Sequence, residues 1–249
     1  MPIAPILRFP GDWQATFTCS FGASVMPSTL ETTVGGVPGP PPGLLLYPCM
    51  ILYALIALNV AISLWGFSVL KKGEGFRRFV FAPFEVARGR NLSGILLNHF
   101  THADLWHLIF NMLTLWIFGQ VVEKLLGIHM LTIYVVSGLA ATVLIFLLRR
   151  NNPDYRVLGA SGSVTGILFA AIVLQPDMNI FFMIVPIPIP APIFAVIYIA
   201  YSTFLLDREV GNVAHEAHIG GALTGVLLAG LLSPHHFAPL LERIQRLLS

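Results

Sequence analysis

Residues 129–148, HMLTIYVVSGLAATVLIFLL, contain no Asp, Glu, Lys or Arg. About 20 consecutive apolar residues are enough for a helix to cross the ~30 Å hydrocarbon core of a bilayer. Further charge-free, apolar-rich windows cover residues 32–70, 105–122, 157–176, 178–206 and 217–241. None shows the alternating pattern of a membrane β-barrel. The pattern predicts an all-α, polytopic membrane protein with six spans, namely residues 44–67, 103–122, 129–148, 159–175, a fifth ending before Asp207, and 214–232.

The composition excludes several classes of protein. Of 249 residues, 56% are hydrophobic and only 10% are charged, whereas a soluble domain carries about 25% charged residues. A net charge of +2, with the charges scattered along the chain, argues against a nucleic-acid partner. The two cysteines, Cys19 and Cys49, cannot build a disulfide framework. The partner that the composition predicts is the lipid bilayer.

The chain divides into three predicted regions. Residues 1–43 include the stretch GGVPGPPPG at 35–43 and are typical of a flexible, Pro/Gly-rich leader. Residues 44–233 form the six-helix membrane core, and residues 234–249 form a short amphipathic tail. The connection at 68–102 contains FRRFVFAPF (76–84), which suits either a membrane-interface element or a basic loop.

Polar side chains occur near the start of alternate predicted spans. Such side chains are costly in lipid, so each is a functional candidate. Because successive spans alternate in direction, the second, fourth and sixth all begin on the same side of the membrane. Their polar residues therefore lie at similar depth. They are His99, His102, His107 and Asn111 in the second, Ser161 and Ser163 in the fourth, and His215, Glu216 and His218 in the sixth.

Two pairs of glycines predict which helices touch. The stretch GASGSVTG (159–166) places Gly162 and Gly166 four residues apart, and HIGGALTG (218–225) does the same for Gly221 and Gly225. Small residues at this spacing let two membrane helices approach closely. We therefore expect the fourth and sixth spans to be in contact.

A hydroxyl and an imidazole at the end of two packed helices suggest a nucleophile and its general base, Ser161 and His218. A buried carboxylate is costly unless it is paired, which favours a dyad over a triad. The oxyanion of such a reaction needs hydrogen-bond donors. The backbone N–H of Ser161, at the helix start, and the side chains of His107 and Asn111 could provide them.

Three stretches resemble motifs of the rhomboid intramembrane serine proteases. GASGSVTG resembles the family's Gly-x-Ser-Gly nucleophile motif, and AHIGGALTG (217–225) resembles its catalytic-histidine segment. HFTHADLWHLIFNMLTLWIFG (99–119) resembles its second-helix signature. The likeness covers residues 44–232 and includes six spans in the family's order.

The resemblance implies an intramembrane serine endopeptidase that cuts peptide bonds in or near transmembrane helices through an acyl-enzyme. Its substrates would be transmembrane proteins, and no metal or cofactor is implied. Ser161 would be the nucleophile and His218 the base. The residues implied for the oxyanion hole are His107, Asn111 and Ser161, and those implied to support the site are His102, Gly159, Gly162 and Gly221.

Two positions depart from the family pattern. Some members have a tyrosine four residues after the nucleophile that stacks on the catalytic histidine, but this chain has Thr165 there. An upstream histidine of some members is replaced by Asn98, next to His99.

Other interpretations remain open. A non-catalytic rhomboid-like protein would bind or guide membrane helices without cutting them. A metalloprotease would need His-Glu-x-x-His, whereas HEAH (215–218) spaces its histidines by three, and no repeat favours a transporter. Among single residues, Ser163 is expected to bond the preceding helical turn and His215 to have a structural role. Glu216 is expected to be an interfacial charge, and Asp104 to cap the second helix.

The absence of an evident targeting presequence and the minimal core favour a prokaryotic plasma membrane, with the active site opening to the outer side. The count of basic residues conflicts with that orientation. Only Arg8, Lys124, Arg243 and Arg246 would lie inside, so a positive-inside count favours the reverse.

Overall fold

The computed structural model describes residues 49–70, 77–181, 187–206 and 214–249. The predicted leader, residues 1–43, lies outside the described residues. The chain divides into two units, residues 1–50 and residues 51–249. The features below belong to the second unit, which begins at the second residue of the first helix, Met50–Leu70.

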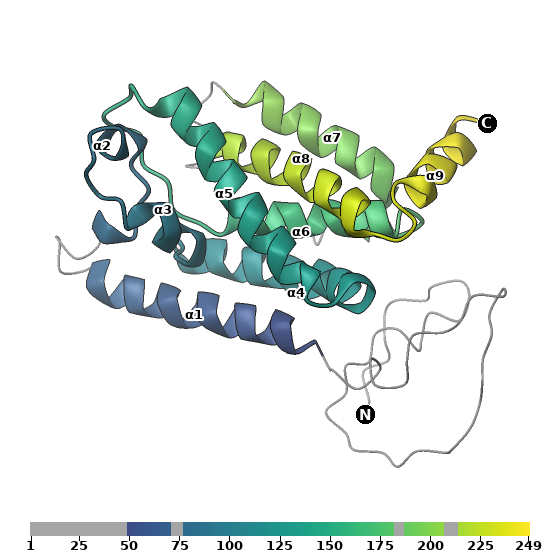
Figure 1. Cartoon of the computed structure of the whole chain (residues 1–249), viewed down its shortest axis with the longest axis horizontal. Helices are drawn as coiled ribbons and strands as arrows, with labels where there is room; N and C mark the ends of the chain where they lie inside the picture. The colour runs from purple at the N-terminus through teal and green to yellow at the C-terminus, as the bar shows by residue number, and fades with distance from the viewer. Residues whose placement is uncertain (1–48, 71–76, 182–186, 207–213) are drawn as a thin grey trace, which may run out of the picture. The chain divides into compact units, whose positions relative to one another are not determined.

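Helices account for most of the described chain (Figure 1). Each of the predicted spans from the second to the sixth overlaps one long helix, and the tail is helical as well. The long helices are α1 (Met50–Leu70), α4 (Leu105–Leu126), α5 (His129–Arg149), α6 (Ser161–Leu174), α7 (Ala191–Phe204), α8 (His215–Leu232) and α9 (Ala238–Leu248). The short elements are α2 (Pro83–Val86), α3 (Gly94–Leu97), η4 (Asn98–Phe100), β1 (Asn179–Phe181) and β2 (Pro188–Pro190).

Three of the described helices, α1, α4 and α5, are long and apolar enough to cross a membrane. Helices α6 and α7 are apolar but only 14 residues long, and α8 begins with the polar stretch His-Glu-Ala-His. The fold is therefore a mostly helical membrane bundle. The count of six spans stays a prediction.

Helix α6 lies at the centre of this bundle. Every residue from Gly162 to Val173 is buried, because α4, α5 and α8 pack around the helix. A helix that is apolar on all sides is stable only in such surroundings or in lipid. By contrast, α7 exposes large apolar side chains such as Val196 and Ile197, as expected of a lipid-facing helix.

The predicted contact between the fourth and sixth apolar segments is confirmed. A Cβ placed on Gly221 would overlap the carbonyl oxygen of Gly162, and one placed on Gly225 would overlap that of Gly166. Both pairs advance in the same direction, so α6 and α8 run parallel. Their first turns therefore lie at the same end of the bundle.

The proline-rich stretch before α7 forms part of a small hairpin. Strand β2 pairs antiparallel with β1, with Ile189 opposite Ile180. Its prolines lie in a two-stranded sheet, where little ladder bonding is lost. The tail, α9, places Arg246 2.9 Å from the carboxylate of Asp177, in the segment that follows α6.

Candidate active site

Ser161 is the first residue of α6 and is half-buried. Its N–H belongs to the first turn of the helix and has no partner within it. The chain enters this turn through Gly159, whose φ of +143° strongly favours glycine. The Gly159 N–H donates to the carbonyl of Asn98 at 3.1 Å, which fixes the start of the turn.

His107 lies directly against this turn. A Cβ at Gly159 would come within 2.7 Å of the His107 ring, so only glycine leaves the imidazole its space. The backbone N–H of His107 donates to the Asp104 carboxylate at 2.9 Å, which confirms that Asp104 caps α4. Local helix-capping chemistry therefore places this ring beside the turn that carries Ser161.

His218 lies in the first turn of α8, one residue after Ala217. A Cβ on Gly162 would lie 3.3 Å from the Ala217 carbonyl oxygen. The residues next to Ser161 and to His218 are therefore in close contact. The His218 ring packs against Tyr198, with ring centroids 5.7 Å apart, and lies edge-on to the His215 ring, with centroids 5.9 Å apart.

Within the described chain, no hydrogen bond joins the Ser161 hydroxyl to the His218 ring; the neighbouring Asn111 amide and Thr165 hydroxyl bond instead to the His107 carbonyl and to Tyr198. In unliganded enzymes, catalytic hydrogen bonds are often long and tighten only when substrate binds. The geometry thus places the two groups at adjacent helix starts without bonding them.

Asn111 and His102 both contact His107, the first at its backbone and the second at its ring. The Asn111 amide donates to the His107 carbonyl at 2.9 Å, which leaves its second N–H available. The His102 ring lies edge-on to that of His107 at 5.2 Å. Its Nδ1 is 2.8 Å from the Ser63 hydroxyl, while its Nε2 is buried without a hydrogen-bond partner.

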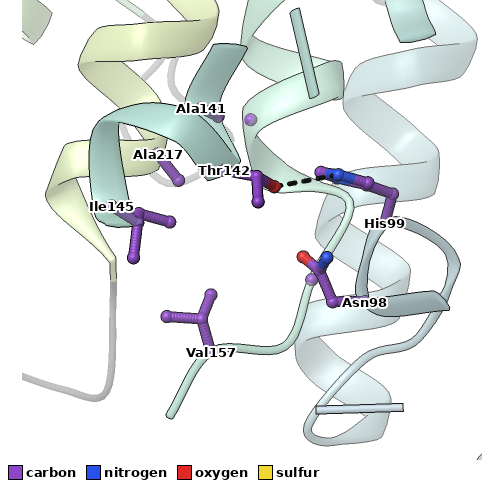
Figure 2. A pocket seen from close by; sticks show the side chains of 9 residues that line it. Asn98, His99, Ala141, Thr142, Ile145, Val157 and Ala217 are labelled. Carbon is purple, nitrogen blue, oxygen red and sulfur yellow. Dashed lines mark hydrogen bonds between the residues drawn. The ribbon is translucent and has the colours of Figure 1, made fainter. Parts of the chain in front are cut away.

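Asn98 and His99, where the chain departs from the family pattern, make local contacts. The Asn98 amide donates to the carbonyls of Gly94 and Ile95. The His99 Nε2 lies 3.0 Å from the Thr142 hydroxyl. Figure 2 shows both residues at the edge of a small pocket, opposite side chains from α5 and α8.

Glu216 was expected to be an interfacial charge, and this prediction was wrong. Its side chain is only 2% exposed and forms an ion pair with Arg149. The Tyr155 hydroxyl donates to the same carboxylate at 3.0 Å, and Arg149 also donates to the Leu206 carbonyl. Because a buried carboxylate requires partners, this cluster ties the start of α8 to the end of α5.

Two further expectations concern buried polar groups. Ser163 was expected to bond the preceding turn, but its hydroxyl is buried with no hydrogen-bond partner, so this prediction was wrong. Both ring nitrogens of His215 are also without a hydrogen-bond partner, and its ring packs edge-on against Tyr201. Across the ranges that the structure describes, no group of three or more His, Cys, Asp or Glu side chains could hold a metal ion.

The sequence did not single out Tyr198, Tyr155 or Arg149. Tyr198 is one of several aromatic residues in an apolar segment, and Arg149 looks like an ordinary charge at the end of a span. Only the packing of α7 and α5 against α8 distinguishes them. No local pattern could have identified them.

The fold and these contacts define a helical membrane protein whose polar groups gather at one end of a tightly packed helix pair. A family model described as the rhomboid domain matches residues 89–235, more than half of the chain. The chain belongs to the rhomboid family, whose members are generally serine intramembrane proteases.

Curated relatives support the same assignment. The chain is 28% identical over 192 residues to rhomboid protein 1, mitochondrial, of Saccharomyces cerevisiae, covering 75% of this chain and 54% of that protein. It is 27% identical over 185 residues to the presenilin-associated rhomboid-like protein A, mitochondrial, of Danio rerio, covering 71% and 46%. It is 30% identical over 155 residues to RHOMBOID-like protein 4 of Arabidopsis thaliana, covering 61% and 37%.

These relatives correct one prediction. All three come from eukaryotes, and two are named as mitochondrial, so the expected prokaryotic plasma membrane was wrong. The chain spans about half the length of the first two relatives that it matches.

Proposed function

We propose that this protein is an intramembrane serine endopeptidase that hydrolyses peptide bonds in or near the transmembrane helices of other membrane proteins. The observation that carries the proposal is the parallel packing of α6 on α8 through Gly162 and Gly221. This packing brings the helix starts that carry Ser161 and His218 to one place. A serine and a histidine from separate apolar helices have no structural need to meet there.

The reaction divides into acylation and deacylation. The Ser161 hydroxyl attacks the scissile carbonyl while the neutral His218 imidazole takes its proton. The resulting imidazolium then protonates the leaving amine, and the C–N bond breaks to leave an ester on Ser161. A water molecule, deprotonated by His218, cleaves this ester and restores both side chains.

Charge develops on the carbonyl oxygen during each attack, and donors must be in place to stabilise it. The Ser161 N–H, the second amide N–H of Asn111 and the His107 ring are the proposed donors. His102 restrains the orientation of the His107 ring through the edge-on ring contact, with centroids 5.2 Å apart. Gly159 gives the ring its space.

We further propose that α6, α7 and α8 cross the membrane together with α1, α4 and α5. The 14 residues of α6 are about 21 Å long at 1.5 Å per residue, which is shorter than a ~30 Å hydrocarbon core. With the Asp177 end at one surface, Ser161 lies several ångströms below the other. Helix α6 can be short because protein surrounds it rather than lipid.

The mitochondrial names of two relatives support a location in a mitochondrial membrane. The substrates proposed are transmembrane proteins of that membrane. A peptide bond in a helix is shielded by its hydrogen bonds. Substrates with helix-weakening residues near the cut are therefore expected to be preferred.

The test is cleavage of a model transmembrane helix by the purified protein in liposomes. We expect Ser161→Ala to lower kcat by at least about 10³-fold, and a fluorophosphonate probe to label the wild type at Ser161. Ser163→Ala is the matched control, because it removes a buried hydroxyl two residues away that has no hydrogen-bond partner. It should retain activity.

Full activity in Ser161→Ala would disprove the proposed nucleophile. A wild type that neither cleaves the helix nor reacts with the probe would favour the non-catalytic alternative, a protein that binds or guides membrane helices.

A further inference from the structure

Tyr198, on α7, contacts both helices of the proposed dyad. Its ring centroid lies 5.7 Å from that of His218, with 36° between the two ring planes. Its hydroxyl lies 3.3 Å from the hydroxyl of Thr165. Thr165 is four residues after Ser161, which places it one helical turn further along the same face of α6. Tyr198 therefore bridges α8 and α6 next to the site.

Two other aromatic rings hold Tyr198 in this orientation. Phe169, from α6, packs against it edge-on, with centroids 5.5 Å apart and 62° between the planes. Phe194, one turn earlier on α7, lies 5.7 Å away at 37°. Offset and edge-on contacts of this kind are favourable beyond the burial that they provide. The orientation of the Tyr198 ring is consequently determined by several contacts.

His218 needs a support of this kind. Its ring has no hydrogen bond to Ser161 in the described structure, so hydrogen bonding to its partner does not fix its rotamer. Thr165, one turn after Ser161 on α6, has no ring with which to stack. Tyr198 supplies a tilted ring contact to this imidazole from a third helix, α7.

We propose that Tyr198 is a positioning residue that holds the His218 imidazole in the orientation required for proton transfer with Ser161. The aromatic ring does the positioning, and the hydroxyl bond to Thr165 locks the ring to α6. This inference rests on the proposed function, since it assigns a task to Tyr198 only if His218 is the base. A misplacement of about 1 Å in a catalytic group can lower the rate about 100-fold.

The experiment compares Tyr198→Phe with Tyr198→Leu in the liposome cleavage assay, with kcat and KM measured separately. Tyr198→Leu removes the ring, and we expect kcat to fall about 10- to 100-fold with KM within about twofold. Tyr198→Phe keeps the ring, and its kcat should stay within about threefold of the wild type. Thr165→Val, which removes the partner hydroxyl, should match Tyr198→Phe, and the double variant should add little, because both remove one bond.

Tyr201→Leu is the matched control on the same helix. Tyr201 is 60% exposed, and its ring packs on His215 rather than on His218. The control should keep the wild-type kcat. The melting temperature of each variant in detergent shows whether the fold is retained.

An unchanged kcat in folded Tyr198→Leu would overturn the positioning role. Equal losses in Tyr198→Phe and Tyr198→Leu would also overturn it, since the ring would then not be the acting group. Both results require an active wild type. A wild type that is inactive and unlabelled by fluorophosphonate would instead overturn the proposed function itself.

Discussion

Gly159 is the residue at which backbone and side-chain constraints meet most tightly. Its φ of +143° is unfavourable for any residue with a Cβ. Independently, a Cβ at this position would overlap the His107 ring. The turn into α6 and the placement of a proposed oxyanion donor therefore depend on one missing side chain.

We expect Gly159→Ala to lower proteolytic activity at least about 10-fold, because the strained turn and the displaced His107 both move groups that must be in place before reaction. Activity and melting temperature should be measured together. Gly89→Ala is the matched control, since Gly89 also has a positive φ, +70°, but its Cβ would meet no atom within 4 Å. Equal activity in the two variants would show that the contact with His107 is unimportant.

Residue identities select the motif positions as candidates but not their neighbours. Ser161, His107 and His218 stand out because polar groups are rare in apolar segments. Glu216 was misjudged, because its neutralising partner, Arg149, lies 67 residues away in the chain. Tyr198 could not be selected, since the sequence does not show which face of α7 meets α8.

At the scale of elements, the Arg149–Glu216–Tyr155 cluster joins the start of α8 to the end of α5 and the segment after it. We expect Glu216→Gln to lower the free energy of unfolding by about 1–3 kcal/mol, because Arg149 loses its buried carboxylate partner. Thermal or chemical unfolding in detergent measures the change. Glu85→Gln is the control, as it removes a surface pair with Arg90 and should lower the stability much less, because solvent screens an exposed pair. Similar losses in the two variants would contradict a special role for the buried cluster.

The same cluster predicts a dependence on alkaline pH. Burial, followed by the charge of Glu216, raises the pKa of Tyr155 above its ordinary value of 10.0. The folded state therefore keeps the proton more strongly than the unfolded state. The stabilisation is complete below pH 10 and is lost as pH rises from there through the folded-state pKa.

We expect the melting temperature of the wild type to fall more steeply between about pH 9 and 11 than that of Tyr155→Phe. The phenylalanine variant has no phenol to titrate, so this part of the slope should disappear. Parallel curves for the two proteins would mean that Tyr155 titrates alike in both states.

The positions of the helices were easier to predict than the number of helices that cross the membrane. Charge is excluded from apolar segments for energetic reasons, so charged residues marked the ends of α4 and α5 within a few positions. The 14-residue length of α6 was not predicted. An apolar segment can be surrounded by protein or by lipid, and the sequence alone does not distinguish the two; α6 is surrounded by protein.

At the scale of the whole molecule, the contacts between connecting segments divide into two sets. On one side, the Glu123 carboxylate at the end of α4 accepts from the N–H groups of Ile51 and Leu52 at the start of α1. Arg246 of α9 pairs with Asp177, after α6. Six alternating crossings put all of these segments on one membrane face.

The other set joins the opposite ends. Phe81 and Val157 exchange backbone hydrogen bonds at 2.9 Å, and Arg149 donates to the Leu206 carbonyl after α7. Six crossings place these segments together on the face that carries Ser161. No contact in either set requires a segment to be on both faces, which supports the proposal that α6, α7 and α8 cross along with the three longer helices.

Single cysteines labelled with a membrane-impermeant maleimide test this arrangement without relying on proteolysis. In a Cys19→Ser, Cys49→Ala background, Ile128→Cys, Ile187→Cys and Ser249→Cys should share one side of sealed vesicles that hold the protein in a single orientation. Ile187 and Ser249 share a side because two crossings, α7 and α8, lie between them. Asp154→Cys should react only from the other side, because one crossing, α5, separates it from Ile128. Labelling after permeabilisation controls for accessibility. Reaction of Ser249→Cys and Asp154→Cys from the same side would contradict six crossings, since an even number of crossings would then separate residue 154 from the tail, whereas α6, α7 and α8 make three.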